Sequence, residues 1–300
     1  MNFVQHLTRQ QDTAGGSMLC VGLDPDPQRF PLPWRGDARR TFDFCAAIVD
    51  ATRDLVCAFK PQIAHFAALR AEDQLEALVA HIHRRAPGVP VILDAKRGDI
   101  GSTAEHYATE AFVRYRADAV TLSPLMGQDS LEPYLRHDGK GLILLCRTSN
   151  PGGTELQGQM MAADVATDNG AHEVDGADGA PAERLYERIA RLAAGRWNRS
   201  GRLGLVVGAT FPEELARVRA LAPTLPLLVP GIGAQGGDAA ATVRAAWRPG
   251  APLIVSSSRA VLYAADAAGR GDAGIAVCAA EARQAAAATQ ALLQQARDRG

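Results

Sequence analysis

The sequence has little of what marks several protein classes. Its 300 residues include 32 Lys and Arg against 33 Asp and Glu, a net charge of -1, so no basic excess favours nucleic acid or an anionic membrane. No apolar stretch approaches the ~20 residues that a membrane-spanning helix needs. The first residues also lack the basic and apolar regions of a secretory signal. These absences favour a cytoplasmic globular protein.

Cysteine is scarce as well, and its pattern argues against a disulfide framework. The five cysteines are odd in number and irregularly spaced, at Cys20, Cys45, Cys57, Cys146 and Cys278. Neither Cys-x-x-Cys nor His-x-x-x-His occurs. We therefore expect small core residues in a reducing compartment and no protein-bound transition metal.

What the chain does contain is an alternation of short apolar runs with helical patterns. The runs have the length and branching of buried parallel strands. They lie at residues 18–23, 55–59, 91–96, 119–122, 141–146, 203–208, 227–229 and 252–255. Eight such strands alternating with helices predict an α/β fold, a (β/α)8 TIM barrel that forms a single domain over residues 1–300. A doubly wound sheet is the alternative, but Asp24-Pro25-Asp26-Pro27 stands where that fold wants a Gly-rich turn.

Helical spacing and capping residues lie between the strands. Helices are predicted at 38–54 with Asp37 as N-cap, 71–86, 103–115 with Ser102 or Thr103 as N-cap, 128–136, 181–198, from Phe211 with Thr210 as N-cap, and 273–298 at the C-terminus. Residues 153–180, after the fifth strand, are rich in Gly, Asp, Ala and Gln and have little periodicity. That segment is long for an ordinary connection, so we expect an inserted loop or a lid.

The third strand ends in a group of charged residues. Asp94 and Lys96 are two residues apart, so strand alternation puts them on one face, and Asp99 follows beyond the break at Arg97-Gly98. A lone Asp-x-Lys is commonly an exposed ion pair of little worth. However, the active site of a (β/α)8 barrel lies where its strands end, and Lys60 ends the second strand.

Two lysines in one pocket would repel each other and lose protons, unless alternation with Asp94 and Asp99 keeps all four groups charged. A charged ammonium can donate a proton to a developing carbanion, whereas a neutral lysine would favour Schiff-base chemistry. The charge count thus favours proton transfer.

The seventh and eighth strands end in a different kind of sequence. The glycine-rich turn 231–237 follows the seventh strand, and Arg259 follows the eighth. Barrels often bind a phosphate there on backbone N–H groups, so we predict a phosphate site. Taken alone, the turn could be no more than a flexible connection, and Ser149-Asn150-Pro151 after the fifth strand could be only a turn.

Together these motifs resemble the orotidine 5′-phosphate decarboxylase family. The matching segments, in chain order, are Asp24, Lys60, Asp94-Ala-Lys96-Arg-Gly-Asp99-Ile100, Ser149-Asn-Pro-Gly, Pro230-Gly-Ile-Gly-Ala-Gln235-Gly-Gly and Arg259. The length and the insertion are similar to the longer bacterial subgroup. The resemblance implies decarboxylation of orotidine 5′-phosphate to UMP and CO2 in pyrimidine biosynthesis. It also implies a homodimer with shared active sites and no metal or organic cofactor.

The resemblance further implies a role for each residue. Lys60, Asp94 and Lys96 form a charged array with Asp99 of the neighbouring subunit, in which Lys96 protonates C6 of the pyrimidine and Asp94 lies against the substrate carboxylate. The implied substrate-binding residues are Asp24, Ile100, Thr103, Ser149, Pro230, Gln235, Ser258 and Arg259. The ribose hydroxyls are held by Asp24 and Lys60 and, from the neighbouring subunit, by Asp99 and Thr103. Ser149 binds the pyrimidine edge and Arg259 the phosphate, while Gln235 spans base and phosphate.

Two other functions remain open from the sequence. A magnesium-dependent sugar-phosphate decarboxylase or synthase uses the same barrel but is expected to carry an acidic ligand at the end of the second strand, where this chain has Lys60-Pro61-Gln62. A catalytically silent nucleotide-binding barrel could keep Gln235 and Arg259. It would have little reason to keep the alternating charges.

Overall fold

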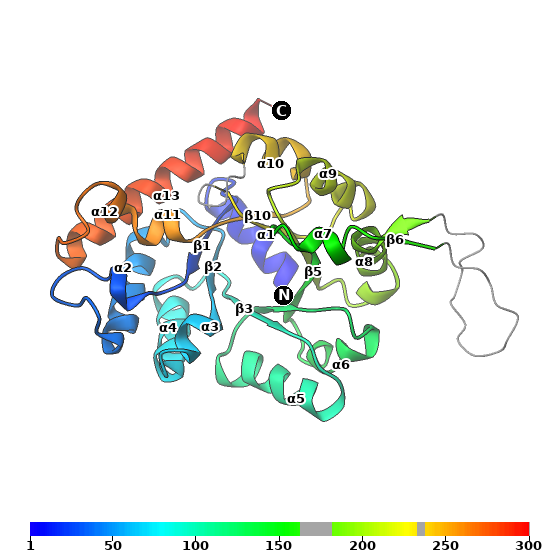
Figure 1. Cartoon of the computed structure of the whole chain (residues 1–300), viewed down its shortest axis with the longest axis horizontal. Coiled ribbons are helices and arrows are strands. Elements are labelled where there is room, and N and C mark those ends of the chain that lie inside the picture. The colour runs from blue at the N-terminus through cyan, green and yellow to red at the C-terminus, as the bar shows by residue number, and fades with distance from the viewer. Residues whose placement is uncertain (163–181, 233–237, 300) are drawn as a thin grey trace, which may run out of the picture.

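Within residues 1–162, 182–232 and 238–299, which the computed structural model describes, eight parallel strands form one sheet that closes on itself (Figure 1). The strands are β1 (Leu19–Leu23), β2 (Ala58–Pro61), β3 (Ile92–Arg97), β4 (Ala119–Leu122), β5 (Gly141–Arg147), β8 (Leu203–Val207), β9 (Leu227–Pro230) and β10 (Leu253–Ser257). Their order is β2-β1-β10-β9-β8-β5-β4-β3, and parallel bridges between Phe59 and Val91 and between Gln62 and Asp94 join the two ends. The predicted (β/α)8 barrel is confirmed.

Helices surround the strands (Figure 1). They are α1 (Phe3–Thr13), α2 (Thr41–Thr52), α3 (Ile63–Ala67), α4 (Glu72–Arg85), α5 (Gly101–Thr109), α6 (Glu132–Leu135), α7 (Gly153–Leu156), α8 (Leu185–Ala194), α9 (Pro212–Leu221), α10 (Ala239–Ala246), α11 (Arg259–Leu262), α12 (Ala264–Ala267) and α13 (Ile275–Asp298). Single turns of 3-10 helix lie at Pro27–Arg29, Ala38–Arg40, Gln128–Ser130 and Arg196–Asn198, and a π-helical turn lies at Glu110–Arg114. No helix of the described ranges is long and apolar enough to cross a bilayer.

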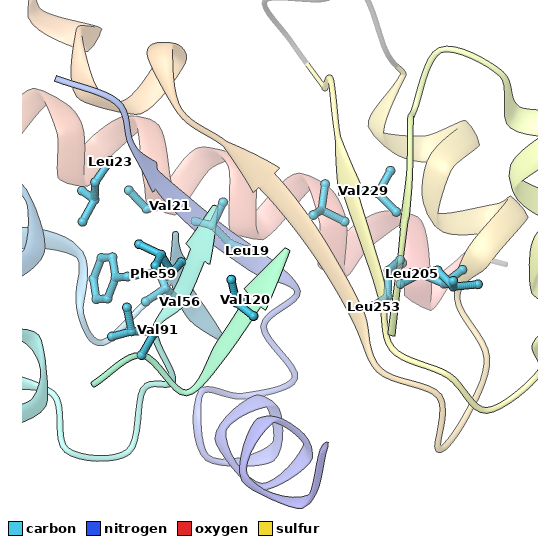
Figure 2. Close-up of a cluster of buried hydrophobic side chains, with 14 of the residues drawn as sticks. Leu19, Val21, Leu23, Val56, Phe59, Val91, Val120, Leu205, Val229 and Leu253 are labelled. Carbon is cyan, nitrogen blue, oxygen red and sulfur yellow. The ribbon is translucent and has the colours of Figure 1, made fainter. Parts of the chain in front are cut away.

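Strand alternation divides the buried side chains into two cores. Residues such as Leu19, Val21 and Leu23 of β1 point outward and pack under the helices, as Figure 2 shows. Alternate residues such as Cys20 and Ile92 point into the barrel and form a second, smaller cluster. Both faces of each strand are therefore covered, which explains why the strands read as continuous apolar runs.

Helix α1, which the sequence analysis did not predict, closes one end of the barrel. Its Phe3 and Leu7 are buried against the inward-facing residues of the strands. Gly141 at the start of β5 makes this possible, since a Cβ there would lie 2.3 Å from the Phe3 ring. The helix was missed because only Phe3, Leu7 and Gln10 are buried along its length, too few for a clear apolar stripe. The opposite end of the barrel, where the strands end, stays open for a site.

Several predicted boundaries were wrong. The second strand begins at Ala58, three residues later than expected, because the half-buried Leu55 and the buried Val56 belong to the turn that enters the barrel. The helix expected over 103–115 changes to a π-helical turn after Thr109. Those expected over 128–136 and 181–198 each divide into an α-helical and a 3-10 part. Burial alone does not distinguish a strand from the loop that leads into it.

Of the three predicted helix caps, one was confirmed and two were wrong. Asp37 accepts a hydrogen bond from the backbone N–H of Arg39 and caps the predicted helix at Ala38, which begins as a 3-10 turn and continues without a break into α2. The N-cap of α5 is Ile100, without a side-chain bond, so neither Ser102 nor Thr103 caps that helix. Thr210 donates its hydroxyl proton to the Ser149 carbonyl and does not cap α9. At Thr210 a tertiary contact took precedence over the local capping preference.

The predicted insertion over 153–180 lies largely outside the described residues. Its described beginning contains α7 and the short strand β6 (Met160–Met161), which pairs antiparallel with β7 (Glu183–Arg184). The chain thus leaves and re-enters the barrel at adjacent points. The lid remains a prediction.

Candidate active site

A cavity of about 410 Å³ opens where the strands end. This volume suits a small-molecule ligand. Of the residues predicted from the sequence, it is lined by Asp24, Lys60, Asp94, Lys96, Ser149, Pro230, Ser258 and Arg259. The barrel brings together residues from strands that are up to 235 positions apart in the sequence, as expected for the carboxyl ends of parallel strands.

At the centre of the cavity wall, one carboxylate lies between two ammonium groups. Asp94 Oδ2 is 2.7 Å from Lys60 Nζ, and Asp94 Oδ1 is 2.6 Å from Lys96 Nζ. The side chains of Lys60 and Asp94 are 7% and 10% exposed, whereas that of Lys96 is 46% exposed. The Lys96 ammonium is therefore the member of this array that a ligand reaches most easily.

The array holds its charges in spite of burial. Burial would raise the pKa of Asp94, but the ammonium groups of Lys60 and Lys96 outweigh it and hold that pKa well below its usual range. Burial would likewise lower the pKa of Lys60, but Asp94 and then Asp24 outweigh it and raise that pKa above its usual value. Lys60 and Asp94 are thus both ionised at neutral pH, which agrees with the expectation from the charge count.

A β-bulge brings Asp94 and Lys96 together. Leu93 pairs with Val120 and Arg97 with Leu122, so three residues of β3 face the single residue Thr121 of β4. Lys96 itself has a φ of 48°, in the left-handed region that costs a residue with a Cβ roughly 1–2 kcal/mol. The predicted proximity is therefore present, but it arises from a bulge and not from plain strand alternation.

The end of β1 supplies a second carboxylate to the cavity. Asp24 Oδ1 is buried and is one of the polar atoms of the described residues that have no hydrogen-bond partner. Its backbone is fixed from the far side by Tyr263, whose hydroxyl donates to the Asp24 carbonyl at 3.1 Å and accepts from the Asp26 N–H at 2.7 Å. A buried acceptor without a donor, facing a cavity, fits a ligand hydroxyl.

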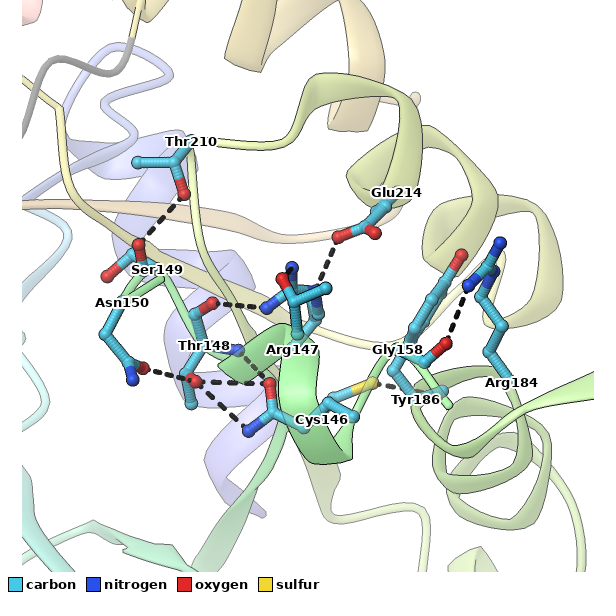
Figure 3. A network of polar contacts seen from close by, with 12 residues as sticks. Cys146, Arg147, Thr148, Ser149, Asn150, Gly158, Arg184, Tyr186, Thr210 and Glu214 are labelled. Carbon is cyan, nitrogen blue, oxygen red and sulfur yellow. Dashed lines mark hydrogen bonds and ion pairs between the residues drawn. The ribbon is translucent and has the colours of Figure 1, made fainter. Parts of the chain in front are cut away.

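Ser149 stands on a loop that a buried guanidinium holds in place (Figure 3). The Arg147 guanidinium is fully buried and donates to Glu214, to the Thr148 carbonyl and to the Thr154 hydroxyl. Thr210 adds a bond from its hydroxyl to the Ser149 carbonyl at 3.2 Å. These contacts, all drawn in Figure 3, tie the loop after β5 to α7 and α9. The site is thereby attached to two surrounding helices.

The ends of β9 and β10 form the opposite wall. Pro230, Ser258 and Arg259 line the cavity there, and Arg259 is exposed at its rim. Ser258 packs so closely on β1 that a Cβ at Gly22 would lie 1.9 Å from its hydroxyl oxygen, so that position requires glycine. Gln235 and the rest of 233–237 lie outside the described residues.

Three predicted residues are not among those that line this cavity. Asp99 accepts a hydrogen bond from the backbone N–H of Ile100, Ile100 is 57% exposed, and Thr103 is exposed at the start of α5. They follow the bulge in the chain, Asp99 and Ile100 in the connection from β3 to α5 and Thr103 in α5.

Sequence reasoning missed some of the lining. The cavity is also lined by Gln62, His65, Thr121, Ser256 and Ser257. A signal for Thr121 was present, since it is the single polar residue within the apolar run 119–122 and alternation points it inward with Asp94. Across the described part of the chain, no group of three His, Cys, Asp or Glu side chains is arranged to hold a metal ion.

The fold and the cavity define a class of protein: a (β/α)8-barrel enzyme whose site holds a buried carboxylate between two lysines. The model of the orotidine 5′-phosphate decarboxylase / HUMPS family matches residues 17–273. The chain belongs to this family.

Relatives of this family match the chain over nearly its full length and nearly all of their own. An orotidine 5′-phosphate decarboxylase of Methylibium petroleiphilum is 68% identical over 286 residues, which cover 94% of this chain and 95% of the relative. Another from Albidiferax ferrireducens is 62% identical and covers 99% of both chains. The structure of the Leishmania donovani OMP decarboxylase matches with a TM-score of 0.72 at 35% identity, over 97% of this chain and 99% of that one.

Proposed function

We propose a residue-level account of the reaction that this family membership assigns to the chain, the decarboxylation of orotidine 5′-phosphate to UMP in pyrimidine biosynthesis. The observation that carries the account is the buried Asp94 between Lys60 and Lys96. The two ammonium groups beside Asp94 place positive charge at the cavity wall. That wall suits a reaction in which negative charge develops on a carbon atom.

In this account Lys96 is the proton donor. As the bond between C6 and the carboxylate carbon breaks, its electron pair stays on C6, and the Lys96 ammonium transfers one proton to that atom. Asp94 lies against the substrate carboxylate, so the repulsion between the two anions is relieved when neutral CO2 leaves. Lys60 balances the charge of Asp94 before and after the transfer. The proton comes from the protein, so the account needs no metal or organic cofactor.

The remaining lining residues hold the substrate by its distant parts. The unpartnered Asp24 oxygen accepts from a ribose hydroxyl, and Ser149 bonds the edge of the pyrimidine. Arg259 and Ser258 bind the phosphate together with Gln235, and Pro230 forms the adjacent wall. Binding energy from these remote groups can then be used to hold the reacting carboxylate against Asp94.

The unit that carries out the reaction is a homodimer in this proposal. Asp99, Ile100 and Thr103 lie outside the cavity of their own barrel, so they can complete the site of a partner. Ile100, Leu125 and Met126, which follow neighbouring strands, are 57%, 60% and 52% exposed, an apolar surface that a second copy would cover. The five cysteines are free and buried, consistent with a cytoplasmic location.

Mixing two inactive variants tests the dimer. Asp99→Ala and Lys60→Ala should each be nearly inactive alone, assayed with orotidine 5′-phosphate in buffer containing EDTA. A mixed dimer has one site with both lesions and one site with neither. Random exchange makes half of the dimers mixed, so about a quarter of wild-type activity should return.

If no activity returns although subunit exchange is demonstrated independently, Asp99 contributes to the active site of its own subunit. Mixing Asp94→Ala with Lys60→Ala is the matched control, because both residues line one cavity. That mixture should stay inactive.

A further inference from the structure

The hydroxyl of Thr121 uses all of its hydrogen-bonding capacity within the β-bulge. It accepts from the backbone N–H groups of Ala95 and Lys96, each at 3.0 Å, and donates to Asp94 Oδ1 at 2.9 Å. A threonine hydroxyl has two lone pairs and one proton. The two backbone donors occupy both lone pairs. The single proton is donated to the Asp94 carboxylate.

This arrangement fixes two features of the array at once. The bulge takes Ala95 and Lys96 out of the ladder between β3 and β4, so their N–H groups need another acceptor in a buried setting. Thr121, which is 1% exposed, supplies it and so holds Lys96 in its left-handed conformation. The same oxygen sets the rotation of the Asp94 carboxylate, and with it the direction in which Lys96 Nζ points.

We propose that Thr121 is a positioning residue for the proton transfer, acting through Asp94 and the Lys96 backbone. This inference rests on the proposed role of Lys96 as proton donor. Thr121 also lines the cavity, but its hydroxyl is committed to the protein, so it contributes little to ground-state binding of the nucleotide. The expected signature is a loss in kcat with little change in affinity for UMP.

The test compares one substitution that removes the hydroxyl with another that keeps it. Thr121→Val keeps the shape and removes the hydroxyl, and should lower kcat roughly 10- to 100-fold, the range expected for losing a hydrogen bond to a charged group. Thr121→Ser keeps the hydroxyl and should stay within about threefold of wild type. The dissociation constant for UMP should change less than about threefold in both.

Three results would overturn the proposal. One is a kcat of Thr121→Val within threefold of wild type. The second is an equal loss of kcat in the Val and Ser variants, because the Ser variant keeps the hydroxyl and its loss would need another cause. The third is a loss of UMP affinity equal to the loss of kcat. If Thr121→Val does not fold, Thr121→Cys replaces it, because a thiol is of similar size and forms weaker hydrogen bonds. A wild-type kcat in the Cys variant would also contradict the proposal.

Lys96→Ala, measured beside them, separates this inference from the proposed function. If that variant keeps its kcat, the role of Lys96 is wrong whatever Thr121 does. If it is inactive while Thr121→Val is unaffected, only the role of Thr121 is wrong.

Discussion

Lys60 and Arg147 are both buried cations at the ends of barrel strands, but their surroundings differ. Lys60 shares one carboxylate with a second ammonium, that of Lys96, and the three charges face an open cavity. Arg147 has a carboxylate of its own, Glu214 Oε2 at 2.5 Å from Nε, and its other guanidinium nitrogens donate to neutral oxygens. The ring of Phe211 covers it, with the guanidinium carbon 4.1 Å from the ring centroid.

The difference distinguishes a reactive charge from a structural one. Around Arg147 each guanidinium nitrogen has a protein partner, and the charge is balanced on the spot. Around Asp94 two ammonium groups share one carboxylate, and the second carboxylate of the cavity, Asp24, has a buried oxygen without a hydrogen-bond partner. Charged groups that the protein leaves open to a ligand therefore locate the site better than buried charge as such.

The largest expected effect is a loss of kcat, and it follows from changing the charged array around Asp94. Lys96→Ala should lower kcat by roughly 10²- to 10⁴-fold, the range for loss of a general acid, because it removes the proposed proton donor. Affinity for UMP and the melting temperature should change little, since Lys96 is half exposed and Asp94 keeps Lys60. A steady-state assay that finds more than a tenth of wild-type kcat would remove Lys96 from the mechanism.

Asp94→Asn should destabilise the fold. With the carboxylate gone, the buried Lys60 loses its counter-ion, and the free energy of unfolding should fall by about 3–5 kcal/mol at pH 7. Because the folded-state pKa of Asp94 is lowered, its contribution is complete above the unfolded value near ~3.9 and is lost as the pH falls through the folded value.

The stability difference between wild type and Asp94→Asn should therefore stay constant from about pH 5 to pH 8 and shrink in more acidic buffer. Urea unfolding at a series of pH values measures it. A difference that grows below about pH 4 would contradict the direction of the Asp94 shift.

Arg147→Met should have the opposite profile to Lys96→Ala. It removes the bonds to Glu214, Thr148 and Thr154, and should destabilise the fold by about 2–3 kcal/mol, while kcat falls less than about tenfold. Arg147→Lys is the matched control for charge. It should recover only part of the stability, because an ammonium lacks the planar fork. The comparison fails if Arg147→Met keeps its stability and loses its activity.

Arg259→Ala extends the comparison to an exposed cation at the cavity rim. It should weaken binding of orotidine 5′-phosphate by about 1.5–3 kcal/mol, since one charge-assisted bond to phosphate is lost. Turnover of the nucleoside without phosphate should barely change. Equal losses for both substrates would mean that Arg259 is structural and that the phosphate binds elsewhere.

Strand positions and the charged array could be predicted because they depend on local pattern. The run 119–122 coincides with β4, and the close contact of Asp94 with Lys96 was expected from their spacing. Short apolar runs in a barrel are buried on both faces, so hydrophobicity alone marks them well. The active site of a (β/α)8 barrel lies where its strands end, and this predicted that Asp24, Lys60 and Ser149 share one cavity, as they do.

The features that hold the site in place were not predictable in the same way. Arg147 and Glu214 are 67 residues apart, and their spacing carries no signal that they will meet. The bulge at Asp94–Lys96 depends on an acceptor from another strand, Thr121. Its place in an apolar run marks it as an inward-facing polar residue, but sequence alone does not reveal that it binds the N–H groups of Ala95 and Lys96. The cap predicted at Thr210 was wrong for the same reason, since its hydroxyl is used by a distant loop.

Helix α1 has a consequence for how the chain is made. Its Phe3 and Leu7 pack on residues of β8, β9 and β10, and Gln11 donates to the Leu253 carbonyl at 2.7 Å, across 242 positions. At roughly 5–20 residues per second, a ribosome needs about 10–50 s to synthesise the chain between them. An isolated helix of 11 residues is marginal in water. During synthesis, α1 therefore emerges long before β10, the strand to which it is bonded in the closed barrel.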